Sequence, residues 1–184
     1  MRQLFVIRHC ESVANSKDLI SGQTDVPVGD CIINMQEYAK TQFKNLLILS
    51  SPLSRCKETA EKLKIYLPML MKDIVIDNNL IERNMGIFEG EKREVLVQRY
   101  PDYFTKGRFI HHKTPPEGET FDSFYERIRS FSSTLYSILD KNDVIICSHN
   151  QTLKLLYAIM KNVPLEELWY GKDFKSGVFE EIRM

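Results

Sequence analysis

The sequence predicts a three-layer α/β fold, in which a mostly parallel sheet lies between helices and a small helical and loop insertion covers one edge. Three observations support this prediction. Short apolar runs of strand length recur along the 184 residues, helical patterns separate them, and residues 84–120 interrupt the alternation. Strands that alternate with helices form parallel sheets with helices on both faces.

Four apolar runs predict buried strands, because they are short, rich in β-branched residues and bounded by polar residues. These runs are Leu4–Ile7, Leu46–Leu49, Ile74–Ile76 and Val144–Cys147. A fifth segment, Val178–Ile182, alternates between apolar and polar residues, which is typical of a half-buried strand. We expect it at the edge of the sheet.

Helical patterns fill the intervals between these strands. Apolar residues at three- and four-residue steps predict helices over Ser54–Leu67, Phe121–Leu139 and Leu153–Met160. Within residues 84–120, only Glu91–Arg99 has a helical pattern, and the remainder is rich in glycine, proline and charge. Long insertions of this kind are usually functional, often as lids. We expect one domain, residues 1–184, with a lid-like insertion at about 84–120.

The charge balance excludes a partner that binds through bulk electrostatics. The chain has 25 basic and 25 acidic residues, so its formal net charge is zero. A nucleic acid or an anionic membrane surface is therefore not expected as a partner. No apolar run approaches the roughly 20 residues of a membrane span, and the first apolar run is too short for a signal peptide. We expect a cytoplasmic protein whose oligomeric state the sequence leaves open.

The cysteines and histidines do not form a metal or redox motif. The four cysteines are far apart, form no C-x-x-C pair and have no arginine at the spacing of cysteine phosphatases, so zinc, thiol catalysis and a disulfide framework are not expected. We expect free thiols, as in a reducing cytoplasm. Adjacent His111 and His112 rarely point at one ion, and no nucleotide-binding glycine motif occurs. The sequence therefore predicts no metal and no cofactor.

Chemistry-bearing side chains follow the predicted strands. Open α/β sheets bind ligands outside the carboxyl ends of their strands. The residues that follow these ends are Arg8, His9, Arg55, Glu82 and His149. Such a set suits phosphoryl transfer, because arginine matches phosphate oxygens, imidazole can attack phosphorus, and a carboxylic acid can protonate the leaving oxygen.

These residues stand in motifs that resemble the histidine phosphatase superfamily, which includes the cofactor-dependent phosphoglycerate mutases. The family's opening motif appears as Arg8-His9-Cys10-Glu11-Ser12 followed by Asn15. Its later motifs appear as the stretches 51–60, 80–90, 118–120 and 147–150, in family order along nearly the whole chain. A single such motif is weak, whereas several in register are a specific signal.

The resemblance implies a role for each motif residue. His9 would be the nucleophile and Glu82 the proton donor. The transferred phosphoryl group would be bound by Arg8, Arg55 and His149, with help from Asn15. We also expect contacts to the substrate from Asn150, Gln23 and Arg83, although Arg83 could equally be a surface charge. Lys106, Arg108 and Lys113 could attract an anionic part of the substrate or line a solvated face.

Two motif glycines are replaced, by Cys10 and Asn150. A thiol at position 10 could narrow the pocket, whereas asparagine tolerates the left-handed conformation that glycine adopts. The predicted activity is that of a metal-independent phosphomonoesterase, which hydrolyses small phosphorylated metabolites through a phosphohistidine on His9. The first alternative is a phosphoglycerate-type mutase. The second is a catalytically degenerate protein that binds phosphorylated ligands.

Overall fold

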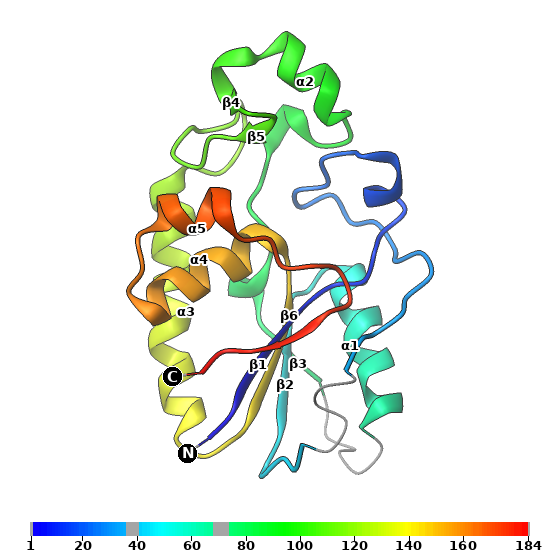
Figure 1. Cartoon of the computed structure of the whole chain (residues 1–184), viewed down its shortest axis with the longest axis vertical. Coiled ribbons are helices and arrows are strands. Elements are labelled where there is room, and N and C mark those ends of the chain that lie inside the picture. Colours follow the sequence, from blue (N-terminus) through cyan, green and yellow to red (C-terminus); the bar gives the residue numbers. More distant parts are fainter. Residues whose placement is uncertain (1, 36–40, 68–73, 184) are drawn as a thin grey trace.

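A five-stranded sheet forms the centre of the molecule (Figure 1). The computed structural model describes residues 2–35, 41–67 and 74–183. The strand order is β3-β2-β6-β1-β7, and all neighbours are parallel except β7, which pairs antiparallel with β1. The strands are β1 (Leu4–Arg8), β2 (Leu47–Ser50), β3 (Ile74–Ile76), β6 (Val144–Ser148) and β7 (Phe179–Glu181). The predicted α/β class and the predicted edge strand are confirmed.

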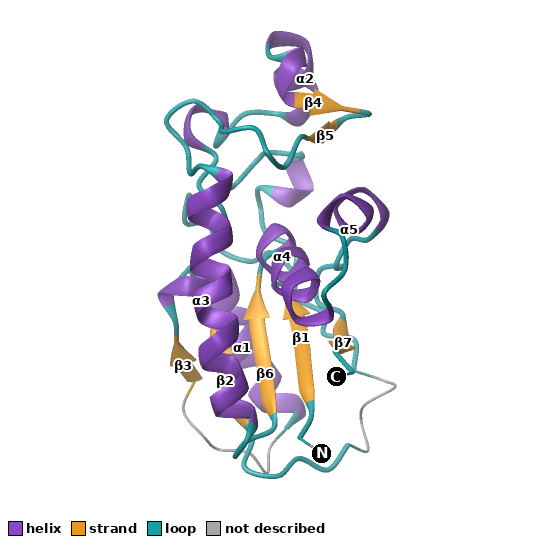
Figure 2. Cartoon of the chain, turned by 90° about the vertical axis from the view of Figure 1, so that its left-hand side faces the viewer, coloured by secondary structure: helices purple, strands orange, loops and turns teal. Residues whose placement is uncertain are grey.

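Helices cover both faces of this sheet (Figure 2). They are α1 (Ser54–Tyr66) on one face and α3 (Phe121–Leu139), α4 (Asn150–Lys161) and α5 (Leu165–Gly171) on the other. Helix α5 was not predicted, since seven residues carry too little periodicity to identify it. Helix α4 begins three residues earlier than predicted, and its first turn therefore reaches the carboxyl end of β6.

Side chains of β1 alternate between two hydrophobic cores. Leu4 and Val6 pack in a cluster with residues of α3 and α4, whereas Phe5 and Ile7 pack in a cluster with residues of α1. All four side chains are at most 1% exposed. This alternation follows from the two-residue period of a strand, and it explains why the buried strand has no polar face.

Segment 84–120 stands over the carboxyl end of the sheet, at the top of Figure 1. It contains α2 (Arg93–Arg99) and a hairpin of β4 (Phe104–Thr105) and β5 (Arg108–Phe109), which the sequence did not predict. Strands of two residues show no alternation that could reveal them. Single 3₁₀ turns occur at Asn15–Lys17, Asn78–Leu80, Gly86–Phe88 and Pro101–Tyr103.

The segment has a small core of its own and closes on itself at a glycine. Its buried apolar residues form a cluster with Ile20 from the loop after β1. Gly86 has a φ of 53°, and a Cβ there would lie 2.0 Å from the Pro116 carbonyl oxygen. A side chain at this position would therefore push the two ends of the segment apart.

The prediction of four free thiols is wrong for two of them. Cys10 and Cys31 form a disulfide, while Cys56 and Cys147 are free and buried. Two cysteines 21 residues apart leave no spacing motif that reveals such a pair, since only the fold brings them together. Within the described ranges, no helix is long and apolar enough to cross a membrane.

Candidate active site

Seven of the predicted site residues surround one cavity of about 120 Å³ at the carboxyl edge of the sheet. They are Arg8, His9, Asn15, Arg55, Glu82, His149 and Asn150. The topology explains this, because parallel β1 and β6 are neighbours and end at the same edge. The backbone N–H of His9 donates to the Ser148 carbonyl, which extends this pairing to the site.

His9 is held as a neutral imidazole. Its Nδ1 donates to the Cys10 carbonyl at 2.7 Å, and its side chain is almost fully buried. Burial, followed by the charges of Arg55 and Arg8, lowers the pKa of His9 to about 3. Because Nδ1 carries the proton, the lone pair on Nε2 is free, and Nε2 has no hydrogen-bond partner among the residues that the structure describes.

His149 lies beside His9, and their ring centroids are 5.2 Å apart. Its Nδ1 accepts a hydrogen bond from Arg55 Nε at 3.3 Å, and its Nε2 lies 2.8 Å from Ser51 Oγ. Burial, followed by the nearby His9 and Arg55, lowers the pKa of His149 well below its usual range. His149 is therefore also neutral, and Ser51 fixes the orientation of its ring.

Two arginines, the buried Arg55 and the half-buried Arg8, supply the positive charge. The Nη atoms of Arg55 donate to the carbonyls of Thr24 and Gly22 at 2.8 and 2.7 Å, so the loop after β1 holds this side chain. Arg8 Nη1 donates to the Phe174 carbonyl at 3.1 Å, near the C-terminal end of the chain. Each Nη carries a second N–H, which leaves both guanidinium groups able to bind an oxyanion.

The Glu82 carboxylate lies at the N-terminus of α4. Its Oε1 accepts hydrogen bonds from Thr152 N, Thr152 Oγ1 and Arg83 N, and its Oε2 accepts one from Gln151 N. Backbone N–H groups at a helix N-terminus are good donors for an anion, since they lack partners within the helix. These four contacts hold the carboxyl group against the cavity that the two histidines line.

The two residues that replace motif glycines do not obstruct the site. The Cys10 side chain bonds to Cys31, and it does not line the cavity. Asn150 is the first residue of α4, so the left-handed conformation expected there is not needed. Its side chain instead bridges to Asp173 Oδ1 and to the backbone N–H of Phe174. Both substitutions keep the cavity open.

Gln23 and Arg83 lie outside this cavity, contrary to expectation. The Gln23 amide donates to the Glu82 carbonyl at 2.9 Å. Arg83 is fully buried, and its guanidinium donates to the carbonyls of His111, Lys113 and Glu119. Burial lowers the pKa of Arg83 to about 10. Gln23 therefore supports the backbone of Glu82, and Arg83 supports the backbone of segment 84–120.

Sequence reasoning did not identify several residues of the site. Arg93 and Gln151 line the cavity, and Ser51 holds His149. Ser51 lies within the recognised motif at 51–60, so its position was visible although its partner was not. Arg93 resembles any exposed helix residue in the sequence, since only the tertiary structure turns α2 toward the cavity.

A metal site does not emerge from the histidines at 111 and 112. His111 is buried beside Trp169 and Phe121, with Nε2 3.5 Å from Glu166, whereas His112 is exposed. In the described part of the chain, no group of three or more His, Cys, Asp or Glu side chains is arranged to hold a metal ion.

The fold and this cavity define a class of protein. A neutral histidine beside two arginines, at the carboxyl edge of a parallel sheet, is an arrangement for acting on phosphate esters. The model of the histidine phosphatase superfamily, branch 1, matches residues 4–174. The chain belongs to this superfamily, and the predictions of its family and of an enzyme of the histidine phosphatase type are confirmed.

Several known proteins are similar to this chain. The adenosylcobalamin/alpha-ribazole phosphatase of Escherichia coli is 27% identical, over 91% of this chain and 83% of that protein. Phosphoserine phosphatase 1 of Hydrogenobacter thermophilus is 26% identical, over 96% of this chain and 84% of that protein. The solved structure of Bacillus stearothermophilus YhfR has a TM-score of 0.83 at 22% identity, over 100% of this chain and 91% of that one, which supports the fold.

Proposed function

We propose that this enzyme is a metal-independent phosphomonoesterase that hydrolyses small phosphorylated metabolites through a phosphohistidine on His9. The observation that carries the proposal is the His9 ring itself. Its Nδ1 is committed to a carbonyl and its Nε2 is free at the wall of a cavity that two arginines also line. A nucleophile needs such a lone pair, and a phosphoryl group needs such cations.

The first half of the reaction transfers the phosphoryl group to the enzyme. His9 Nε2 forms a bond to phosphorus while the bond from phosphorus to the alcohol oxygen breaks. Arg8 and Arg55 bind the equatorial oxygens, and they stabilise the charge that these carry in the transition state. Glu82, in its protonated form, gives its proton to the departing oxygen, so the alcohol leaves neutral.

The second half returns the enzyme to its starting state. The Glu82 carboxylate takes a proton from a water molecule, the water oxygen bonds to phosphorus, and the bond between phosphorus and His9 Nε2 breaks. Inorganic phosphate leaves, Glu82 is again protonated, and His9 is again neutral. In this scheme His149 and Asn15 orient the phosphoryl group, while Ser51 and Gln23 act only by positioning His149 and Glu82.

A trapping experiment tests the proposal. We expect a burst of protein-bound label after mixing with ³²P-labelled p-nitrophenyl phosphate, and the bond should be acid-labile and base-stable, as a phosphohistidine is. His9→Asn should abolish the burst and lower kcat by about 10⁴-fold or more. The matched control is His112→Asn, since His112 is exposed on segment 84–120. A burst that survives in His9→Asn would contradict the proposal.

The same reaction mixtures separate the two alternatives. A phosphoglycerate-type mutase would return an isomerised phosphate ester, whereas the phosphatase releases inorganic phosphate. A degenerate binding protein would bind phosphate and turn over no ester. We favour the phosphatase, because the 120 Å³ cavity adjoins a larger cavity with which it shares five lining residues, and an enzyme that retains its phosphoryl group must keep water out.

We further propose that residues 1–184 act as one domain in the cytoplasm, with no nucleic-acid or membrane partner and with residues 84–120 as a lid-like insertion. The zero net charge supports the first point on partners. The Cys10–Cys31 disulfide argues against the cytoplasmic location, since disulfides persist mainly in oxidising compartments. Trapping thiols during cell lysis would show whether the pair is oxidised in place, and fractionation would show the compartment.

A further inference from the structure

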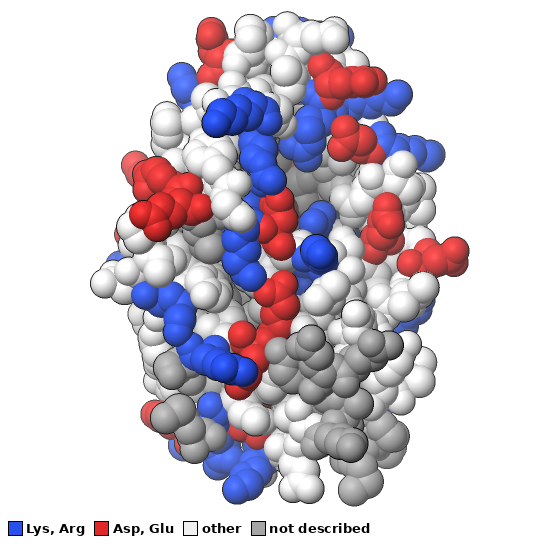
Figure 3. Space-filling model, viewed as in Figure 1, with Lys and Arg blue, Asp and Glu red and all other residues white. Residues whose placement is uncertain are grey.

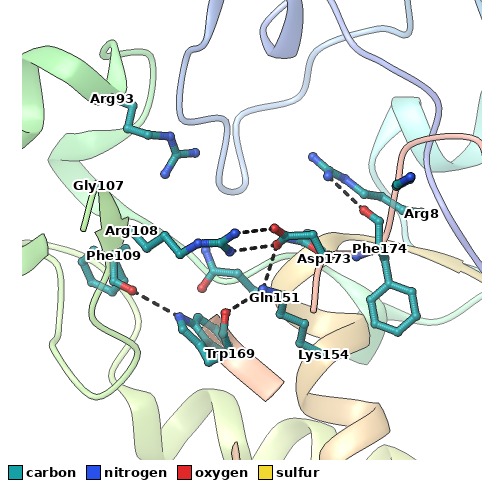
Figure 4. Close-up of a pocket in the computed structure, with 12 residues that line it drawn as sticks. Arg8, Arg93, Gly107, Arg108, Phe109, Gln151, Lys154, Trp169, Asp173 and Phe174 are labelled. Atoms are coloured by element: carbon teal, nitrogen blue, oxygen red, sulfur yellow. Dashed lines mark hydrogen bonds and ion pairs between the residues drawn. The ribbon is translucent and has the colours of Figure 1, made fainter. Parts of the chain in front are cut away.

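A second cavity lies beside the catalytic one. It has a volume of about 450 Å³, within the range of ordinary small-ligand pockets. We call it the side cavity. It lies between the hairpin of segment 84–120 and the loop after α5 (Figure 4). Five residues line both cavities, namely Arg8, Arg93, Phe109, Asn150 and Gln151. A molecule with its phosphoryl group at His9 would therefore extend into the side cavity.

The side cavity is strongly basic, although the chain as a whole has zero net charge. Five cationic residues line it, Arg8, Arg93, Arg108, Lys154 and Lys175, and one acidic residue does, Asp173. Figure 3 shows Lys and Arg side chains around a hollow in one face of the molecule, with some Asp and Glu side chains between them. An excess of one sign in a concave site raises the local concentration of ligands of the opposite sign.

Asp173 does not cancel this excess, because its charge is already balanced. Arg108 donates to both carboxylate oxygens, at 3.2 and 2.7 Å, and Lys154 Nζ lies 2.8 Å from Oδ1. Asn150 donates to the same oxygen at 3.0 Å. Although burial opposes its ionisation, these hydrogen bonds hold the pKa of Asp173 well below its usual range. This carboxylate positions Arg108 and Lys154, and it has little capacity left for a ligand.

Two other cations remain available. Arg93 contacts Asp18 only through Nε, at 3.5 Å, and its Nη atoms donate to no other residue in the described ranges. Figure 4 shows its guanidinium directed toward the side cavity. Lys175 is exposed and forms no ion pair within the described part of the chain. Arg93 stands at the junction of the two cavities, whereas Lys175 lines only the side cavity.

We propose that the natural substrate carries a second anionic group, a carboxylate or a second phosphate, on its alcohol part, and that Arg93 and Lys175 bind this group in the side cavity. The inference rests on the proposed function, since it assumes that the phosphoryl group lies at His9. The aromatic side chains of Phe109 and Trp169, which line the side cavity, would pack against the carbon chain between the two anionic groups. The substrate is thus a small polyanion rather than a neutral sugar or peptide ester.

Matched substrate pairs test the proposal. 3-Phosphoglycerate and glycerol 3-phosphate differ by a carboxylate in place of a hydroxymethyl group, and fructose 1,6-bisphosphate and fructose 6-phosphate differ by the second phosphate. We expect kcat/KM to favour the more anionic member of at least one pair by about tenfold or more. The pair with the larger ratio identifies the second group.

Charge-removing variants locate the preference. Arg93→Gln and Lys175→Gln should each reduce the ratio within the favoured pair about tenfold, chiefly through KM for the anionic member. The matched control is Arg99→Gln, which removes the same charge from the exposed far end of the same helix. A ratio near one in the wild type, or a ratio that persists in both variants, would overturn the proposal.

Binding measurements keep this test independent of catalysis. If no ester is turned over, including p-nitrophenyl phosphate, the proposed function fails by itself. Calorimetry on the His9→Asn protein would still compare the affinities of the two members of each pair. Equal affinities there would overturn the second-anion proposal, and a preference that Lys175→Gln removes would sustain it.

Discussion

At the residue scale, the decisive feature is that two histidines stay neutral between cations. A pKa of about 3 leaves roughly one His9 ring in 10⁴ protonated at pH 7. Burial and the two arginines have the same effect, because each penalises a further positive charge. In the proposed mechanism, the charges that bind phosphate therefore also keep His9 in its reactive form. This coupling explains why Arg8, His9 and Arg55 occur as a set.

The proposed role of Glu82 as proton donor predicts a dependence on the leaving group. We expect Glu82→Gln to lower kcat for alkyl phosphates by about 10²–10³-fold, because the alkoxide needs a proton. The loss should be much smaller for the first step with p-nitrophenyl phosphate, whose phenolate leaves without one. Rapid-quench measurements of the two substrates would read this difference. Glu94→Gln on exposed α2 is the control, and equal losses for both esters would exclude Glu82 as the proton donor.

At the element scale, the site depends on where loops and helix ends meet the sheet. The first turn of α4 presents Thr152 and Gln151 to Glu82, and the loop after β1 supplies the carbonyls that anchor Arg55. Segment 84–120 is tied down by Arg83 from below and by the ion pair of Glu119 with Arg127, at 2.8 Å. The strands and the first turn of α4 thus position the site residues, and the loop after β1 and segment 84–120 hold the side chains around them.

The buried position of Arg83 predicts a loss of stability when it is removed. Arg83→Met leaves the carbonyls of His111, Lys113 and Glu119 without their donor, and we expect the free energy of unfolding to fall by about 3 kcal/mol. Arg129→Met, at an exposed ion pair, should change it by less than about 0.5 kcal/mol. Urea unfolding gives both values. A raised KM at unchanged stability would instead return Arg83 to substrate binding.

The disulfide predicts a second effect on stability. It joins Cys10, beside His9, to Cys31 across 21 residues, so its loss releases a loop of that length in the unfolded chain. We expect Cys31→Ser, or reduction of the wild type, to lower the free energy of unfolding by about 3 kcal/mol. Thiol titration of the denatured, unreduced protein should find two reactive thiols. Four would show that the bond does not form.

At the scale of the whole molecule, charge is distributed unevenly. The totals cancel, yet the two joined cavities together carry Arg8, Arg55, Arg93, Arg108, Lys154 and Lys175 against Glu82 and Asp173. Folding has gathered cations from β1, α1, α2, β5, α4 and the segment after α5 at one end of the sheet. This concentration suits the small polyanion proposed as substrate.

The buried histidines predict how stability depends on pH. The unfolded chain protonates His9 below its usual pKa of about 6.5, whereas the native site resists protonation until about pH 3. The contribution of His9 to the free energy of unfolding is therefore constant above about pH 6.5. It falls as the pH drops below this value, because the unfolded state binds more protons. His9 alone contributes a loss of about 2–3 kcal/mol by pH 4.5.

Urea unfolding between pH 4.5 and 7.5 checks this prediction. His9→Asn should flatten the dependence relative to the wild type, while His112→Asn should leave it unchanged. Parallel curves for the wild type and His9→Asn would mean that His9 is not held neutral in the native protein.

The sequence predicted much of the fold because burial leaves a periodic trace. Strand β1 was visible as a continuous apolar run, and helix α3 and edge strand β7 were visible because their apolar residues recur at periods of about 3.6 and two. Helix α5 and the hairpin of β4 and β5 were not, because each is too short to establish a period. The motif residues of the catalytic cavity were also visible, since parallel strands deliver their ends to one edge.

What the sequence determined by itself is therefore the class of the protein, the sheet and the set of groups at its edge. Only the tertiary structure decided which of these groups meet. It brought Arg93 and Lys175 to a cavity beside His9, joined Cys10 to Cys31, and turned Gln23 and Arg83 into supports. The physical reason is that such contacts join residues far apart in the chain, and a local pattern of side chains carries no record of them.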